Sequence, residues 1–239
     1  MRGFLIILVG LPLAWSAAAG TVTGAAYYDG TVPGLKPVDM DSDPVCTAHY
    51  KDEEPPANEV LVLGEEQSLG NVLVEVIAGL PEDVEYDVPE EPVVLTQLGC
   101  RYSPRMLGVR AGQPLKVLNP DGTLHNVNAA PKKNPAFNRG MPANVKDFEV
   151  VFEEPEPIFA FRCNVHPWML AYCAVLDHPY FAVSSAEKNG AFEIADLPPG
   201  KYTLRATHER LGTQEAEVEV PAEGDAAPVE FRFTRPGAK

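Results

Sequence analysis

The chain has 239 residues, of which 45% are hydrophobic, and a formal net charge of −15 at pH 7. This length allows one large or two small domains with hydrophobic cores. The acidic balance disfavours nucleic acid and anionic lipid as partners and favours cationic ones.

The first residues have the features of a secretory signal peptide. Arg2 gives a short positive start, residues 4–15 form an apolar run, and residues 16–19 are small residues suited to cleavage. The apolar run is too short to span a bilayer, which disfavours the alternative of a membrane anchor. The sequence therefore predicts a signal peptide at residues 1–19 and a mature protein that lies in the periplasm without membrane insertion.

The rest of the chain has the pattern of an all-β protein. Short runs of alternating or β-branched residues recur between Gly, Pro, Asn and Asp, and no window shows sustained helical periodicity. Such spacing is typical of a sandwich or barrel. After an opening strand within residues 20–30, we expect strands near residues 71–78, 91–98, 113–118, 146–152, 158–162, 169–176, 202–207, 214–220 and 229–234.

A cysteine, two histidines and a methionine have the spacing of a metal site. Cys163, His166 and Met169 are each three residues apart, and His125 lies 38 residues before Cys163, where it is expected to reach in from the end of another strand. A thiolate with two imidazoles and a weak thioether is the donor set of a mononuclear copper site that transfers electrons. Because protein side chains fill every position, such a site has no place for a substrate, so we do not expect an enzyme.

The expected strands place these residues at strand ends. Cys163 follows the strand at residues 158–162, and the next strand begins near Met169, so one tight loop carries three of the four donors. Pro167 stiffens this loop because it lacks a backbone N–H. Asn126 is a candidate for tying the two donor loops together by hydrogen bonds.

The pattern H-N-V…C-x-x-H-P-x-M resembles the cupredoxins, most closely those of the amicyanin and plastocyanin type with a short ligand loop. The resemblance implies a Greek-key β-sandwich and a type 1 (blue) copper ion held by His125, Cys163, His166 and an axial Met169. It also implies a periplasmic carrier of single electrons whose partner is a redox protein, such as a c-type cytochrome or a periplasmic oxidoreductase. An apolar rim around an exposed edge of His166 is expected from Met141, Pro142, Trp168, Met169 and Leu170.

The C-terminal part resembles a second family. Gly190, Phe192, Ile194 and the run 197–204 (LPPGKYTL) are similar to the carboxypeptidase regulatory-like, transthyretin-like β-sandwich. This resemblance implies a smaller sandwich and no chemistry. Residues 20–30 resemble the opening strand of the same sandwich, so the N-terminal strand is expected to complete it; tandem order of the domains is the alternative.

The predicted division of the chain is therefore a signal peptide at 1–19, a leader at 20–59, a cupredoxin domain at 60–177 and the smaller sandwich at 178–239. Two other functions stay open: a copper chaperone or storage protein, and a structural binding module. A zinc site formed by Cys46, His49, Cys163 and His166 is a further alternative.

With Cys163 assigned to the metal, three cysteines remain. Cys46 and Cys100 lie in turn-like sequence and are expected to pair in an oxidising compartment, while Cys173 is expected to be reduced and buried within a strand. A Cys100–Cys173 bridge is the alternative, since sequence alone does not fix connectivity.

Overall fold

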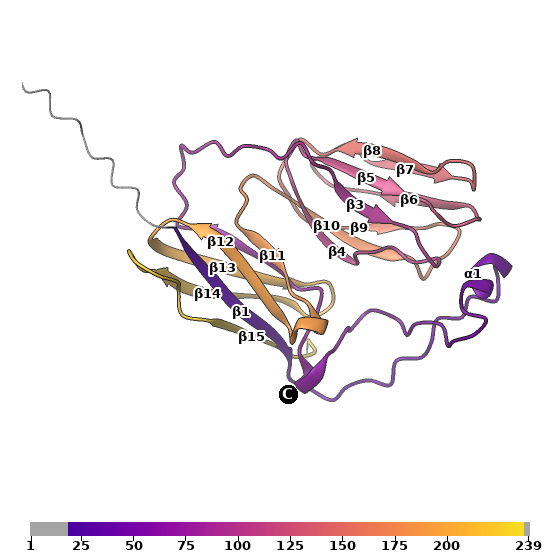
Figure 1. Cartoon of the computed structure of the whole chain (residues 1–239), viewed down its shortest axis with the longest axis horizontal. Helices are drawn as coiled ribbons and strands as arrows, with labels where there is room; N and C mark the ends of the chain where they lie inside the picture. The colour runs from indigo at the N-terminus through magenta and orange to yellow at the C-terminus, as the bar shows by residue number, and fades with distance from the viewer. Residues whose placement is uncertain (1–18, 237–239) are drawn as a thin grey trace, which may run out of the picture.

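The computed structural model describes residues 19–236, which are almost entirely β (Figure 1). The expected signal peptide at residues 1–19 lies outside the described residues except for residue 19. No helix within residues 19–236 is long and apolar enough to cross a membrane. The strands form four sheets that pack in two sandwiches, so the all-β prediction is confirmed.

The first sandwich, named here the central sandwich, contains a five-stranded sheet in the order β4-β10-β9-β6-β7 and a three-stranded sheet in the order β3-β5-β8. Its core takes aromatic and aliphatic side chains from both sheets, such as Leu115, Phe148 and Phe161. The bounds are β3 Val93–Thr96, β4 Met106–Arg110, β5 Pro114–Leu118, β6 His125–Ala129, β7 Phe137–Met141, β8 Asp147–Val151, β9 Glu156–Arg162 and β10 Leu170–Leu176.

The second sandwich, named here the terminal sandwich, contains sheets in the orders β12-β1-β15 and β11-β2-β13-β14. β1 runs antiparallel to β12 and parallel to β15, so the N-terminal strand lies inside a sheet built from the C-terminal segment. The bounds are β1 Gly20–Tyr28, β2 Leu73–Ala78, β11 Phe181–Val183, β12 Ala191–Leu197, β13 Gly200–His208, β14 Gly212–Val220 and β15 Val229–Phe233, with short 3-10 turns at Glu65–Gln67 and Ala186–Lys188.

One strand lies in a different sandwich from the one expected. β2 falls within residues 60–177, yet it pairs with β11 and β13, and Val74 and Val76 are buried in the core of the terminal sandwich. The alternating pattern of β2 identifies a half-buried strand but carries no information about its partner. Because β14 occupies one edge of β13, the other edge offers unpaired backbone groups, which β2 satisfies.

Because residues 20–28 of the expected leader form β1, the name leader is kept from here on for residues 29–59. The leader connects β1 to the far end of the central sandwich, where it forms α1 (Pro44–His49), and then returns (Figure 1). Asp43 caps α1: its side chain accepts hydrogen bonds from the backbone N–H groups of Val45 and Cys46 at 2.8 and 3.4 Å. A disulfide between Cys46 and Cys100 joins α1 to the central sandwich. A helix this short gains its stability from such tertiary contacts.

An acidic side chain at the start of β9 provides a pH-dependent contribution to stability. Glu156 is buried and accepts backbone hydrogen bonds from Lys132, Lys133 and Asn134, the last two at 3.0 and 3.3 Å. Burial raises the pKa of this carboxyl, but the hydrogen bonds outweigh it, and the net pKa lies below the usual value.

We expect Glu156→Gln to destabilise the protein at pH 7 by about 2 kcal/mol, because an amide replaces a charged acceptor. A carboxyl whose pKa is lowered by folding stabilises the fold above the pKa of the unfolded chain, and that stabilisation disappears as pH falls through the folded-state pKa. Denaturant unfolding at pH 7 and pH 3 should therefore show a difference that shrinks in acid. The exposed Glu153→Gln serves as control, and a difference that stays constant between the two pH values would contradict the assignment.

Candidate metal centre

The loop between β9 and β10 carries three of the expected donors. Cys163 follows the last residue of β9, and Met169 precedes the first residue of β10. The loop closes on itself: the Met169 N–H donates to the His166 carbonyl at 2.9 Å, and the Cys163 N–H donates to the Met169 carbonyl at 3.3 Å. The His166 N–H also points to the Cys163 sulfur, 3.4 Å away. The backbone thus holds the thiol and the imidazole close together.

The fourth expected donor reaches the loop from the neighbouring strand. His125 is the first residue of β6, and β6 pairs with β9 through Asn128 and Arg162. Asn126 joins the two loops as expected, since its side-chain oxygen accepts from the Asn164 N–H at 2.7 Å. Adjacent strands therefore bring His125 and Cys163 to the same end of the five-stranded sheet.

The donor atoms of His125, Cys163 and His166 all lie within 4.8 Å of one another, and all three side chains are buried. The two Nδ1 atoms are 2.9 Å apart, and the Cys163 sulfur is 3.8 Å from Nδ1 of His166. Met169 is 2% exposed and belongs to the same hydrophobic cluster as Cys163. The structure thus brings His125, Cys163 and His166 together. Backbone hydrogen bonds place Met169 next to Cys163 and His166.

Two carboxylates that the sequence reasoning missed hold the outer nitrogens of the histidines. Asp121 Oδ2 lies 2.9 Å from Nε2 of His125, and Asp43 Oδ2 lies 3.1 Å from Nε2 of His166. For both carboxyls burial raises the pKa, but hydrogen bonds outweigh it and the net pKa is lowered, so both are ionised at neutral pH. An ionised carboxylate only accepts, so each Nε2 donates its N–H to a carboxylate, and each ring turns its Nδ1 toward the cluster.

This arrangement fits a bound cation. The two Nδ1 atoms are 2.9 Å apart, and a proton or a metal ion between them relieves the repulsion that their lone pairs would have at this distance. Burial raises the pKa of the Cys163 thiol, but hydrogen bonds with His125 and His166 outweigh this effect and lower the pKa to about 6. A thiolate beside two imidazole lone pairs is a donor set that copper and zinc both accept.

The disulfide matches the expected pairing. Cys46 is bonded to Cys100, and among residues 19–236 Cys163 and Cys173 are free and buried. The alternative Cys100–Cys173 bridge is therefore wrong. The zinc alternative also fails because Cys46 is consumed by the disulfide, while Nε2 of His49 lies against Asp121 Oδ1 at 3.1 Å.

The prediction that His166 has an exposed edge is wrong. His166 is only 1% exposed, and Met141 and Met169 are buried as well. Trp168 is partly buried, and its Nε1 donates to the Cys100 carbonyl at 3.0 Å. The leader covers this side of the cluster, which the sequence could not indicate because Asp43 and His166 are separated by 123 residues.

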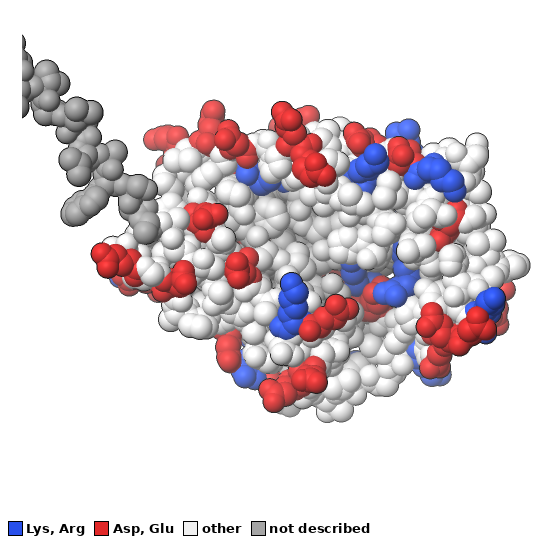
Figure 2. Space-filling model, viewed as in Figure 1, with Lys and Arg blue, Asp and Glu red and all other residues white. Residues whose placement is uncertain are grey.

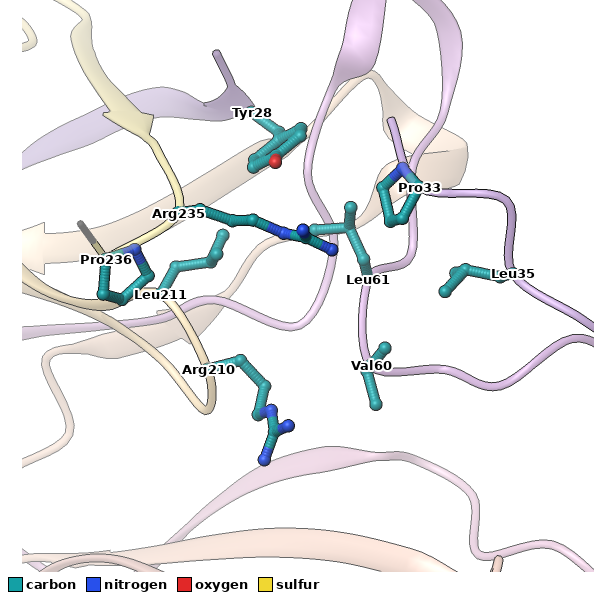
Figure 3. Close-up of a pocket in the computed structure, with 9 residues that line it drawn as sticks. All are labelled: Tyr28, Pro33, Leu35, Val60, Leu61, Arg210, Leu211, Arg235 and Pro236. Atoms are coloured by element: carbon teal, nitrogen blue, oxygen red, sulfur yellow. The ribbon is translucent and has the colours of Figure 1, made fainter. Parts of the chain in front are cut away.

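A separate cavity of about 300 Å³ lies beside the terminal sandwich and contains none of the expected donors (Figure 3). Figure 3 shows the Arg235 side chain extending between Tyr28, Leu61 and Pro33, whereas Arg210 points away from them. The cavity is lined mostly by aliphatic side chains, and its two arginines are exposed. None of its lining residues belongs to the cluster, so the cavity is separate from the candidate metal centre.

Comparisons with known proteins give cupredoxin structures at low similarity. No protein-family model matches the chain, and no curated protein sequence matches it. Among solved structures, a copper-containing nitrite reductase from Thermus scotoductus is 17% identical over 42% of this chain, with a TM-score of 0.34, and the match spans 26% of the reductase chain.

Two smaller proteins match over almost their whole length. A purple cupredoxin from Nitrosopumilus maritimus is 25% identical over 35% of this chain and 99% of its own, with a TM-score of 0.30. An oxidised amicyanin variant is 18% identical over 43% of this chain and 98% of its own, with a TM-score of 0.33.

Proposed function

We propose that this chain is a periplasmic type 1 copper protein that carries single electrons between redox partners. The observation that supports this most strongly is the buried cluster of Cys163, His125 and His166, in which both outer histidine nitrogens are already bonded to carboxylates. His125, Cys163 and His166 would hold copper as the strong ligands, and Met169 as the weak axial one. Bound copper would supply one-electron redox chemistry.

The residues around the cluster are suited to electron transfer rather than catalysis. The carboxylates fix both rings, so the donors are already in place and little has to move when the charge of the site changes. All three donor side chains are buried, which leaves no open position for a substrate. A copper chaperone or storage protein must load and release its ion rapidly, and the burial of these side chains disfavours such exchange.

The remaining assignments are part of the same proposal. The central sandwich would be the cupredoxin domain, and the terminal sandwich would be a transthyretin-like domain that spaces or binds without catalysing a reaction. Asp and Glu side chains are numerous along both sandwiches on the face drawn in Figure 2, in keeping with a net charge of −15. A cationic redox protein, such as a c-type cytochrome or a periplasmic oxidoreductase, suits this charge.

Replacing the axial donor tests the ligand assignment. We expect Met169→Gln to keep copper bound but to lower its reduction potential, because an amide oxygen is a harder donor than a thioether and favours the oxidised ion. Redox titration followed by visible absorption measures the shift. Met106→Leu, a buried methionine between the two sandwiches, serves as control and should leave the potential unchanged. An unchanged potential in Met169→Gln would show that Met169 is not a ligand.

A further inference from the structure

The side of the cluster that holds His166 is closed by a segment from the other end of the chain. Nε2 of His166 lies 3.1 Å from Asp43 Oδ2 and 3.7 Å from the Cys46 sulfur. Both residues belong to the leader, and His166 is 1% exposed as a result. The ring edge that points away from the metal centre therefore contacts protein on this side.

Asp43 is held in place by contacts on both of its oxygens. Oδ1 accepts from the N–H groups of Val45 and Cys46 in the first turn of α1. Oδ2 accepts from the Thr123 hydroxyl at 2.8 Å as well as facing His166. Because Thr123 lies two residues before His125, Asp43 connects the leader to both donor loops. A carboxylate fixed in this way gives the His166 ring a single orientation.

The leader is fastened to the central sandwich around Gly99 and Cys100. The disulfide joins Cys46 to Cys100, and the Tyr50 hydroxyl donates to the Gly99 carbonyl at 2.9 Å. Asp121 in turn accepts from the Gly99 and Cys100 N–H groups at 3.0 and 2.8 Å. The segment that carries the disulfide is therefore bonded to the residue that holds His125. Covalent and hydrogen bonds together keep the leader in place.

We propose that the disulfide-fastened leader is a cap on the metal centre, and that Asp43 is the positioning residue within it that orients His166 and closes its edge to solvent and to a docking partner. The part of this inference that concerns copper rests on the proposed function. The cap makes exchange of electrons at this edge slower than in the same site without the leader contacts.

Chemical modification of histidine tests the cap without any metal. The full chain, copper-free, is treated with diethylpyrocarbonate, and the rate at His166 is followed by peptide mass mapping. We expect the rate to rise at least tenfold in the double variant Cys46→Ala/Cys100→Ala. His208, buried in the terminal sandwich, should react equally slowly in both proteins and reports an intact fold. Cys173→Ala, which removes a buried free cysteine, is the matched control and should leave His166 protected.

Asp43 variants separate a positioning role from a merely structural one. Asp43→Asn retains a hydrogen-bond acceptor for His166 and for α1 but removes the negative charge, so His166 should stay protected while the potential of the copper-loaded protein rises. Asp43→Ala should raise both the potential and the modification rate. If Asp43 had only a structural role, replacing it would change the protection of His166 and the stability of the fold, but the copper potential of Asp43→Asn would equal the wild-type value. That result would overturn the positioning role.

The two proposals fail in different ways. A wild-type His166 that reacts as fast as in the double variant overturns the cap, even in a protein that binds copper. A protein that binds no copper overturns the proposed function, while slow modification of wild-type His166 would still support the cap.

Discussion

Cys163→Ser should abolish the intense visible absorption of the copper-loaded protein while leaving a folded β protein. The absorption of such a site arises from charge transfer between a thiolate and copper, and a serine hydroxyl is not ionised at neutral pH. The Cys163 thiol is the one whose pKa the surrounding histidines lower to about 6, against the effect of burial. Visible spectra of the copper-loaded variant measure the loss, and far-UV circular dichroism checks the fold.

Cys173→Ser is the matched control for this experiment. Cys173 is also a free, buried cysteine, but burial raises its pKa well above the usual value, so it stays a neutral thiol. Its sulfur lies 3.6 Å from the Ala174 carbonyl, to which a serine hydroxyl can also donate. The control should keep the colour. Colour that survives in Cys163→Ser, or disappears in Cys173→Ser, would contradict the ligand assignment.

The second large effect is expected at Asp121. Its carboxylate is fully buried and faces four donors: the Gly99 and Cys100 N–H groups, Nε2 of His125 and Nε2 of His49. Asp121→Ala leaves three buried donors without an acceptor, since only the fourth, on His49, is exposed to water. The free energy of unfolding should therefore fall by about 3–5 kcal/mol. Copper affinity should fall by about 10- to 100-fold, because His125 loses the group that orients it.

Denaturant unfolding of the copper-free protein and competition with a copper chelator measure the two effects of Asp121→Ala. The exposed Asp147→Ala on β8 is the control and should change neither quantity appreciably. Asp121→Asn should lie between wild type and Asp121→Ala, since it keeps an acceptor and loses the charge. A stability loss without any change in copper affinity would show that Asp121 supports the loops but not the ligand.

The residues of the candidate site could be picked out from the sequence because three of them lie close together in the chain. Cys163, His166 and Met169 lie in one seven-residue stretch, and His125 was recognised from the H-N-V motif, although the strand that it begins was not among the expected strands. The Cys46–Cys100 disulfide followed from counting cysteines and from the turn-like sequence around two of them, although the pairing with Cys173 could be excluded only by the structure. Asp121 also had a usable signal, four residues before His125 in a turn sequence.

The contacts that sequence reasoning missed are those between distant segments. Nothing in the leader sequence indicates that Asp43 faces a histidine 123 residues away. The alternation of β2 predicts a strand but not which sheet edge it occupies. The exposed edge of His166 was inferred from the family resemblance, and the leader, which is an addition to the donor-bearing sandwich, covers that edge.

Metal content together with the visible spectrum of the purified full chain tests the central claim most directly. The protein is produced with copper and zinc supplied at equal concentration, oxidised, and examined for bound metal by elemental analysis and for colour by absorption. The account predicts one copper per chain and an intense absorption that a mild one-electron reductant removes and reoxidation restores. A colourless chain that takes up zinc in preference to copper would contradict it.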